Sequence, residues 1–417
     1  MPPRTSSAAR APRAAVATKA RPQPLLGLDK RLVLNQWLLS LFGVQEFEKL
    51  TDLLKDPEYE GYSDDNSTKF LGPLAGLPNR SVTLSLDALR GYDENIVRHW
   101  KQIVERRELV SGLSLYLKYF QYLALLFTEI YLDRYFRDPQ ALCAALTHHA
   151  NSFSIGQAPG DQVGTYSEDD LRKLAYWQAT GSGKTLQMHV NILQYRHYLA
   201  LHDRVHELNR VILLTPNEGL SKQHLDEFGR SKLEAELFRK DSGKRFTSQP
   251  IEIIDINKLA DESKDKTVAV DAFEGNNLVL VDEGHRGAGG EDWMGKRRAL
   301  VEQGFSFEYS ATFGQAMKAA KDTALTQEYA KCIIFDYSYK YFYRDGYGKD
   351  YAIFNLNDDA QADVRLNYLT GGLLAFYQQL RLYRDRPATF APYLLAQPLM
   401  VFVGGRVTRR TMTRDIS

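Results

Sequence analysis

Hydrophobic residues follow two different rhythms along the chain. Up to about residue 153 they recur every three or four positions, as in Leu34, Trp37, Leu38 and Leu41, which is the spacing of one face of an α-helix. Further on, short apolar runs alternate with helical stretches, and these runs cover residues 173–177, 211–214, 251–256, 278–281 and 305–309. Strands that alternate with helices are typical of a parallel sheet. The pattern therefore predicts an α/β domain with helices on both faces of the sheet, preceded by a mainly helical region.

Polar segments divide this pattern into parts. Residues 1–28 carry five basic residues and no acidic one among Ala, Pro and Ser, a composition that cannot bury a core. A solvated tail is the simplest interpretation, and a phosphate-binding arm or an Arg-rich transit peptide are the alternatives. A Gly- and Ser-rich stretch over 152–168 indicates a linker. We expect a disordered tail over 1–30, a helical domain over 31–153, an α/β domain over 165–320 and a hairpin or helical extension over 321–395.

Composition and charge exclude several classes of protein. The 417 residues include 53 basic and 52 acidic ones, so any attraction to nucleic acid must come from a local patch. Two cysteines, Cys143 and Cys332, exclude a disulfide scaffold and favour a reducing compartment. A membrane-spanning helix needs about 20 apolar residues, which no segment supplies, and the first residues lack the apolar core of a secretory signal. We therefore expect a cytoplasmic protein that does not contact a membrane.

The strongest chemical motif is QATGSGKT, residues 178–185, between a predicted strand and an amphipathic helix. Glycines let the backbone approach a phosphate chain, and the following helix directs its positive N-terminus at the phosphates. In such a loop Lys184 would reach the terminal phosphates and the Thr185 hydroxyl would contact Mg²⁺. The motif predicts ATP and Mg²⁺ as cofactors, bound by Thr180, Gly181, Ser182, Gly183, Lys184 and Thr185. One departure is Gln178, which stands where the generic motif has glycine.

A second motif, NLVLVDEGH over 277–285, ends an apolar strand in two carboxylates. Open α/β sheets place their ligands at the carboxyl ends of the strands. We expect Asp282 to bind the Mg²⁺ that bridges the nucleotide oxygens, and Glu283 to orient or deprotonate the attacking water. His285 would contact the γ-phosphate side or a neighbouring motif. The predicted catalytic residues are thus Lys184, Asp282, Glu283 and His285.

Four motifs in this order resemble those of a known family. ATGSGKT, VILLTP (211–216), VDEGH and SAT (310–312) look like motifs I, Ia, II and III of superfamily 2 helicases of the DEAD/DEAH type. They are most similar to the branch that contains the Res subunit of type III restriction enzymes, and the similarity covers about 173–313. It implies a P-loop domain of RecA type and an ATP-dependent helicase or translocase. Gly284 is a mild departure, because many relatives have alanine there.

The resemblance also implies roles for individual residues and partners. Thr215 and Pro216 would touch the nucleic-acid backbone, and Gln121 could recognise adenine or simply be a polar residue on a helix. Coupling between the nucleotide and nucleic-acid sites would fall to Ser310, Ala311 and Thr312. The implied partners are nucleic acid, DNA in preference to RNA, and a methyltransferase or a subunit that carries a second RecA-like domain.

Aromatic residues crowd the stretch 337–351 around an Asp345-Gly346 pair. Their alternate spacing with a D-G turn predicts a β-hairpin packed on the core. A stacking platform for nucleic-acid bases is the alternative.

The C-terminal stretch resembles the beginning of another domain. Residues 397–403 (QPLMVFV) resemble the first strand of a second RecA-like domain, incomplete over 396–417. We therefore expect the N-terminal part of a longer translocase, which binds ATP·Mg²⁺ and hydrolyses it poorly because arginine fingers come from the second domain. The alternative is a non-catalytic ATP-binding module that needs a partner with that domain.

Overall fold

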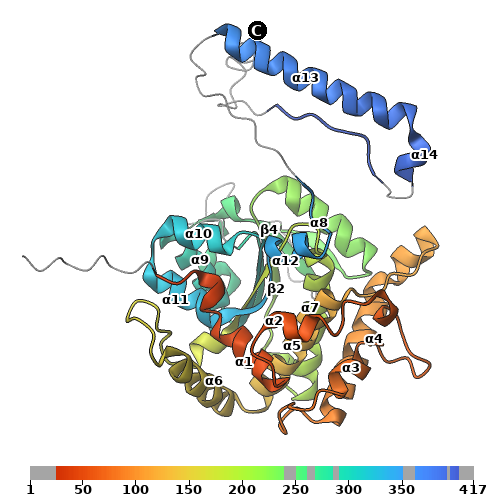
Figure 1. The fold of residues 1–417 in the computed structure, drawn as a ribbon. Coiled ribbons are helices and arrows are strands. Elements are labelled where there is room, and N and C mark those ends of the chain that lie inside the picture. The colour runs from red at the N-terminus through yellow and green to blue at the C-terminus, as the bar shows by residue number, and fades with distance from the viewer. Residues whose placement is uncertain are drawn as a thin grey trace, which may run out of the picture. The chain divides into compact units, whose positions relative to one another are not determined.

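The computed structural model describes residues 25–238, 250–260, 268–284, 291–350, 362–391 and 395–402. Most of the predicted basic tail lies outside these ranges. The chain forms two compact units, residues 1–348 and 349–417. Figure 1 shows the helices and strands of both units.

A seven-stranded sheet forms the centre of the first unit, in the order β3-β4-β2-β7-β8-β1-β9. Every pairing in it is parallel. The strands are β1 (Lys173–Gln178), β2 (Val211–Thr215), β3 (Ala235–Leu237), β4 (Ile251–Asp255), β7 (Leu278–Asp282), β8 (Phe305–Ser310) and β9 (Ile333–Tyr337). A separate parallel pair joins β5 (Leu259–Ala260) and β6 (Val268–Ala269). The five strands predicted from apolar runs are all present, because parallel strands buried on both faces are nearly continuous hydrophobic segments.

Helices cover both faces of the sheet, which confirms the predicted RecA-like α/β architecture (Figure 1). On one face, α5 (Tyr119–Arg137) and α7 (Lys184–Leu201) pack against the strands, with α4 (Leu86–Ser111) behind them. The other face carries α9 (Glu291–Val301), α10 (Phe313–Ala320) and α11 (Thr323–Cys332). Successive residues of β1 point to the two faces. The Tyr176 hydroxyl forms a hydrogen bond with the Thr128 hydroxyl of α5, whereas the Trp177 ring lies beside Gly314 of α10 on the other face.

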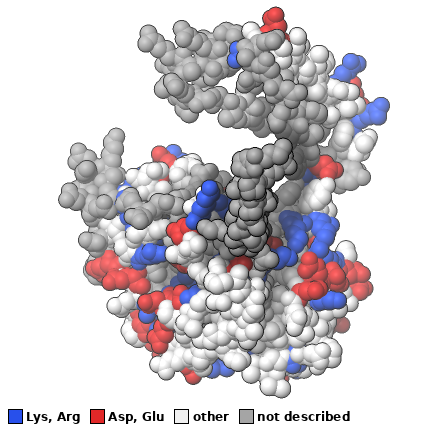
Figure 2. All heavy atoms as spheres, turned by 60° about the vertical axis from the view of Figure 1, so that its left-hand side comes forward, with Lys and Arg blue, Asp and Glu red and all other residues white. Residues whose placement is uncertain are grey.

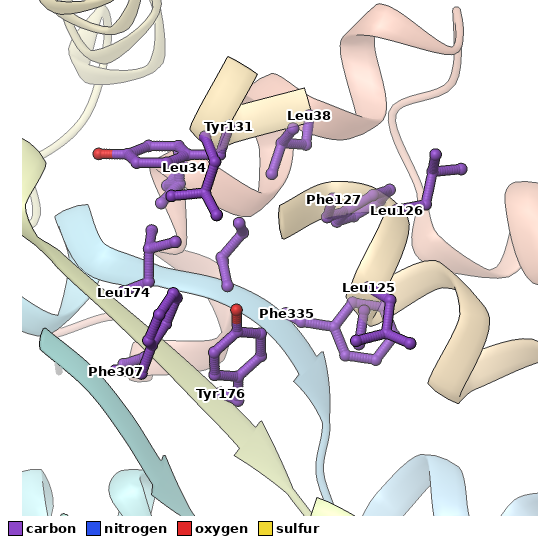
Figure 3. Close-up of a cluster of buried hydrophobic side chains, with 14 of the residues drawn as sticks. Leu34, Leu38, Leu125, Leu126, Phe127, Tyr131, Leu174, Tyr176, Phe307 and Phe335 are labelled. Atoms are coloured by element: carbon purple, nitrogen blue, oxygen red, sulfur yellow. The ribbon is translucent and has the colours of Figure 1, made fainter. Parts of the chain in front are cut away.

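The N-terminal helices and the sheet share one hydrophobic core (Figure 3). Leu34 and Leu38 of α1 (Val33–Leu41) and Phe127 of α5 lie over Tyr176 and Phe335 of the strands. Helix α5 is apolar around almost its whole circumference, and 15 of its 19 residues are buried. Such a helix needs cover on all sides, which α4, α6 (Pro139–Ser154), α7 and the sheet supply.

Further helices complete the first unit. They are α2 (Phe47–Thr51), α3 (Leu71–Ala75), α6 (Pro139–Ser154), α8 (Glu218–Arg230) and α12 (Tyr339–Arg344), with 3-10 helices at Leu28–Lys30, Pro57–Tyr59, Asp169–Arg172, Val205–Glu207, Ile256–Lys258 and Val270–Phe273. None of the helices in the described ranges is long and apolar enough to cross a membrane. On the face in Figure 2, basic and acidic side chains lie intermingled among the described residues.

The predicted β-hairpin in the Tyr-rich stretch is wrong for its described part, residues 337–350. Tyr337 ends β9, and the next residues form helix α12, which the Asp345-Gly346 pair terminates. Gly346 has a φ of 83°, and the Asp345 carboxylate accepts hydrogen bonds from the hydroxyls of Tyr337 and Tyr119. Alternate aromatics also fit a short helix when they pack on different neighbours, and Tyr341 packs on Phe47 of α2 at 5.0 Å. Tyr351 lies outside the described residues.

The second unit contains α13 (Ala362–Asp385) and α14 (Pro387–Phe390). The Tyr383 ring stacks on Phe390, and its hydroxyl donates to the carbonyl oxygen of Leu395 at 3.1 Å. Residues 395–402 form no strand in the described part of this unit, so the strand expected over 397–403 is not formed there.

Candidate active site

The loop between β1 and α7 has the backbone of a phosphate-binding loop. Gly181 and Gly183 have φ values of 90° and 91°, in the left-handed region that favours glycine. Gly183 directly precedes α7, so the free amides of this 18-residue helix face the loop. A Cβ atom at Gly183 would lie 2.4 Å from Nε2 of Gln121. The local chain therefore requires glycine here both for its conformation and for its space.

Lys184 turns back over this loop. Its Nζ donates to the carbonyl oxygens of Gln178 at 3.2 Å and Ala179 at 3.3 Å. Burial lowers the pKa of Lys184, and the carboxylates of Glu283 and Asp282 partly oppose this shift. The structure thus brings the lysine of the first motif and both acids of the second into electrostatic contact.

Gln178 has a structural reason to stand where the generic motif has glycine. Its side chain is fully buried, and Nε2 donates to Oε1 of Gln187 in α7 at 2.7 Å. This bond joins the end of β1 to the helix that follows the phosphate loop. Within the described structure, Ser182 Oγ is buried at the base of the loop without a hydrogen-bond partner.

Asp282 and Glu283 stand at the carboxyl end of β7. Asp282 Oδ1 accepts from the Glu283 amide at 3.0 Å, and Oδ2 accepts from His224 Nε2 at 3.0 Å. Burial by itself would raise the pKa of Asp282, but His224 and Lys184 outweigh it and lower that pKa. Glu283 has a φ of 54°, an uncommon conformation for a residue with a side chain. Such local strain is characteristic of functional sites.

Gly284 fits a crowded position between this turn and β8. A Cβ there would lie 3.2 Å from the side chain of Glu308. The Gly284 amide donates to the carbonyl oxygen of Tyr309 at 2.9 Å, and its own carbonyl accepts from Arg297 Nη1 at 2.9 Å. Glu308 pairs with Arg297 beneath the turn. His285, the fourth predicted catalytic residue, lies outside the described residues.

Gln121 reaches the phosphate loop from the first turn of α5. Its Oε1 accepts from the Lys118 amide at 2.9 Å, and its Nε2 donates to the carbonyl oxygen of Ser182 at 3.0 Å. The residue therefore forms part of the wall of the nucleotide loop.

The SAT and VILLTP motifs lie at the ends of β8 and β2, which pair with opposite edges of β7. Ser310 Oγ accepts from the Thr312 amide at 3.0 Å, and the Ala311 carbonyl accepts from Trp177 Nε1 at 3.1 Å, which links this motif to β1. Thr215 is buried, and its hydroxyl lies 2.6 Å from Ser221 Oγ in α8. Pro216 is half-buried at the end of β2. The Thr215 hydroxyl thus forms a hydrogen bond within the protein. A nucleic-acid contact through this segment remains a prediction.

Two groups of residues near these motifs were not found by sequence reasoning. His224 lies in α8, 58 residues before the aspartate that it contacts. Arg297, Glu308, Lys173 and Tyr329 form a buried charged cluster under the Gly284 turn. No local pattern marks either group, because each pairing joins residues that are distant in the chain.

The donor set suits a magnesium ion that is bound together with a nucleotide. Mg²⁺ is usually held by one or two carboxylates plus substrate phosphates rather than by an all-protein cage. The described residues contain no group of three or more His, Cys, Asp or Glu that could hold a metal. The Asp282 carboxylate at the end of β7 is an oxygen donor of this kind, and the Thr185 hydroxyl remains the second predicted ligand.

Comparison with known proteins agrees with this geometry. Residues 89–315 match the family model described as type III restriction enzyme, res subunit. The match begins in α4 and extends past β8, so it contains the phosphate loop, the Asp282-Glu283 pair and the SAT motif. A search of curated proteins returned no match.

Proposed function

Because the chain belongs to the family of type III restriction enzyme res subunits, we propose that it is an ATP-driven motor acting on DNA. The family places the chain among helicase-like ATPases. The observation that supports the proposal most directly is the convergence of Lys184 with Asp282 and Glu283 at the carboxyl ends of β1 and β7. Phosphoryl transfer needs these three parts: a cation on the phosphates, a metal ligand and a group that orients water.

Each residue has a distinct role in the proposed reaction. Lys184 leaves the carbonyls of Gln178 and Ala179 to bind the β- and γ-phosphates. Asp282 and Thr185 would hold Mg²⁺, which would supply positive charge to the phosphate oxygens. Glu283 orients the attacking water and accepts its proton.

The SAT segment is proposed to transmit the nucleotide state to DNA. Ser310 ends β8 beside β7 and β1, and Trp177 joins β1 to the following Ala311. Thr215 and Pro216, at the end of β2, are the proposed DNA-contacting segment. A cytoplasmic location is part of the proposal. The proposed partners are DNA and either a methyltransferase or a subunit with a second RecA-like domain, which would contribute arginine fingers.

Titration with a non-hydrolysable ATP analogue and Mg²⁺ tests the nucleotide site. We expect Lys184→Ala to weaken binding by at least about tenfold, since a charge-assisted contact to phosphate is lost. Lys222→Ala is the control, because Lys222 is an exposed helix lysine that pairs with Glu218 one turn earlier. Equal affinity of a folded Lys184→Ala protein and the unmodified protein would refute the phosphate-loop assignment.

Hydrolysis and DNA dependence test the motor. ATP turnover should rise when double-stranded DNA and a partner with the second RecA-like domain are added, and RNA should stimulate less. Tight nucleotide binding without turnover under any of these conditions would instead assign the chain to a non-catalytic ATP-binding module.

A further inference from the structure

We propose that His224 is a positioning residue for the metal-binding carboxylate. It orients Asp282 so that the remaining lone pairs of that side chain meet Mg²⁺. This inference rests on the proposed function of the same site, and it adds a residue that lies outside the four sequence motifs.

Both oxygens of the Asp282 carboxylate are held by hydrogen bonds. Nε2 of His224 lies 3.0 Å from Oδ2, and the Glu283 amide lies 3.0 Å from Oδ1. An ionised carboxylate can accept about four hydrogen bonds or metal contacts, so each oxygen keeps a free lone pair. Two donors on different oxygens fix the plane of the carboxylate. The direction of the remaining lone pairs is then set before any metal binds.

The imidazole of His224 has one suitable tautomer. Its Nδ1 is buried and has no hydrogen-bond partner within the described structure, and the whole residue is only 5% exposed. A proton on Nε2 satisfies Asp282, whereas a proton on Nδ1 would bury an unpaired N–H group, which is unfavourable. His224 therefore acts as a donor to the carboxylate.

Helix α8 is anchored on both sides of His224, which gives the ring a fixed place. One turn earlier, Ser221 Oγ lies 2.6 Å from the Thr215 hydroxyl of β2. One turn later, Phe228 is fully buried and stacks on His189 of α7 at 4.3 Å. Residues at this spacing share a helix face. The same face thus contacts β2, β7 and α7.

The end of α8 is also tied to the N-terminal helices. Arg107 of α4 pairs with Glu227 at 2.6 Å and donates to Ser231 Oγ at 2.7 Å. Ser231 Oγ in turn lies 2.7 Å from Nδ1 of His189. These bonds restrain the helix against sliding along the sheet. A donor carried by such a restrained element can position a metal ligand, as outer-shell partners of metal sites do.

The test separates metal affinity from nucleotide affinity. Binding of a non-hydrolysable ATP analogue to the full chain is measured by calorimetry in EDTA and across a Mg²⁺ titration. His224→Leu removes the donor, whereas His224→Gln places an amide N–H near the position of Nε2. His206→Leu is the control, since His206 is exposed on the 3-10 helix after α7. Asp282→Asn is the reference for loss of the metal ligand.

We expect His224→Leu to weaken the apparent Mg²⁺ affinity by about tenfold or more. Nucleotide affinity in EDTA should stay the same, and His224→Gln should recover most of the Mg²⁺ effect. A structural role would instead lower the affinity in EDTA as well. If His224→Leu does not fold, His224→Asn replaces it, because its shorter amide cannot reach Oδ2.

Three outcomes would overturn the inference. In the first, His224→Leu has the same apparent Mg²⁺ affinity as the unmodified protein. In the second, His224→Leu lowers nucleotide affinity equally in EDTA and in Mg²⁺. In the third, His224→Gln recovers none of the Mg²⁺ affinity that His224→Leu loses. Failure of the proposed function has a different signature: the unmodified protein would bind no nucleotide, or would bind it equally well with and without Mg²⁺.

Discussion

Gln121 donates a hydrogen bond from Nε2 to the carbonyl oxygen of Ser182, 3.0 Å away and 61 residues further along the chain. The same Nε2 occupies the space that a side chain at Gly183 would need. A residue of the N-terminal helices is therefore built into the wall of the phosphate loop. The helices before the sheet thus contribute a side chain to this loop, in addition to their part of the shared hydrophobic core.

Removal of this contact should weaken nucleotide binding. We expect Gln121→Ala to reduce ATP affinity about fivefold, in line with the loss of a hydrogen bond worth about 1 kcal/mol. Competition between ATP and GTP shows which role applies: a smaller preference for ATP indicates adenine recognition, and an equal loss for both indicates support of the loop. Gln102→Ala, at an exposed position of α4, serves as the control. Unchanged affinity for both nucleotides would contradict either role.

Glu283→Gln should separate binding from chemistry. The amide keeps the shape of the side chain and removes the base, so nucleotide affinity should stay within about twofold while turnover falls by about 10²–10⁴. The measurement is single-turnover hydrolysis with DNA and a partner carrying the second RecA-like domain. Glu302→Gln, at an exposed position, is the control. Wild-type turnover in the Glu283 variant would exclude it as the water-orienting group.

Two glycine substitutions should have opposite effects. Gly183→Ala places a Cβ 2.4 Å from Gln121 in a left-handed conformation, so we expect loss of nucleotide binding and destabilisation by about 1–3 kcal/mol. Gly91→Ala lies in α4 with no atom within 4 Å of the new Cβ, and should stabilise the protein by about 0.5–1 kcal/mol. Thermal unfolding and nucleotide titration of both variants check this contrast. If Gly183→Ala bound nucleotide with the affinity of the unmodified protein, the loop would have to accommodate the added Cβ.

Glu129 should make stability depend on pH. Burial raises the pKa of Glu129 to about 7, even though Asn95, Gln194 and Tyr198 donate hydrogen bonds to it. A carboxyl group whose pKa is higher in the folded state stabilises the protein fully below its unfolded pKa. That stabilisation is lost as pH rises through about 7, and it amounts to about 3 kcal/mol.

The measurement is urea unfolding between pH 4.5 and 8. The free energy of unfolding of the unmodified protein should fall with pH more steeply than that of Glu129→Gln, which has no titrating group at this position. Glu94→Gln, at an exposed position of α4, should follow the unmodified protein. Parallel curves for the unmodified protein and Glu129→Gln would show that Glu129 ionises normally.

The amino-acid sequence by itself determined the features that depend on neighbours in the chain. The strands β2 and β7 are nearly continuous apolar runs, because both faces of each are buried, and β1, β4 and β8 are short segments in which most residues are apolar or aromatic or alternate with polar ones. The phosphate loop depends on two glycines and the start of the following helix, all within the eight residues 178–185. The order of the motifs was enough to indicate the family.

Short edge elements were harder to predict. Strand β3 has three residues, and β9 has five that precede the Tyr-rich stretch. Alternating aromatics around Asp345-Gly346 fit both a hairpin and a short helix. Packing of Tyr341 on Phe47 and the bonds from Tyr119 and Tyr337 to Asp345 decided for the helix.

Only the tertiary structure decided which distant side chains support the site. Gln121 meets Ser182, and His224 meets Asp282, because the sheet order places β2 next to β7 and α5 beside α7. Neither contact has a local sequence pattern, since hydrogen-bond partners are set by three-dimensional proximity and burial rather than by spacing along the chain. The sequence determined the groups that meet the nucleotide, and the fold determined what holds those groups in place.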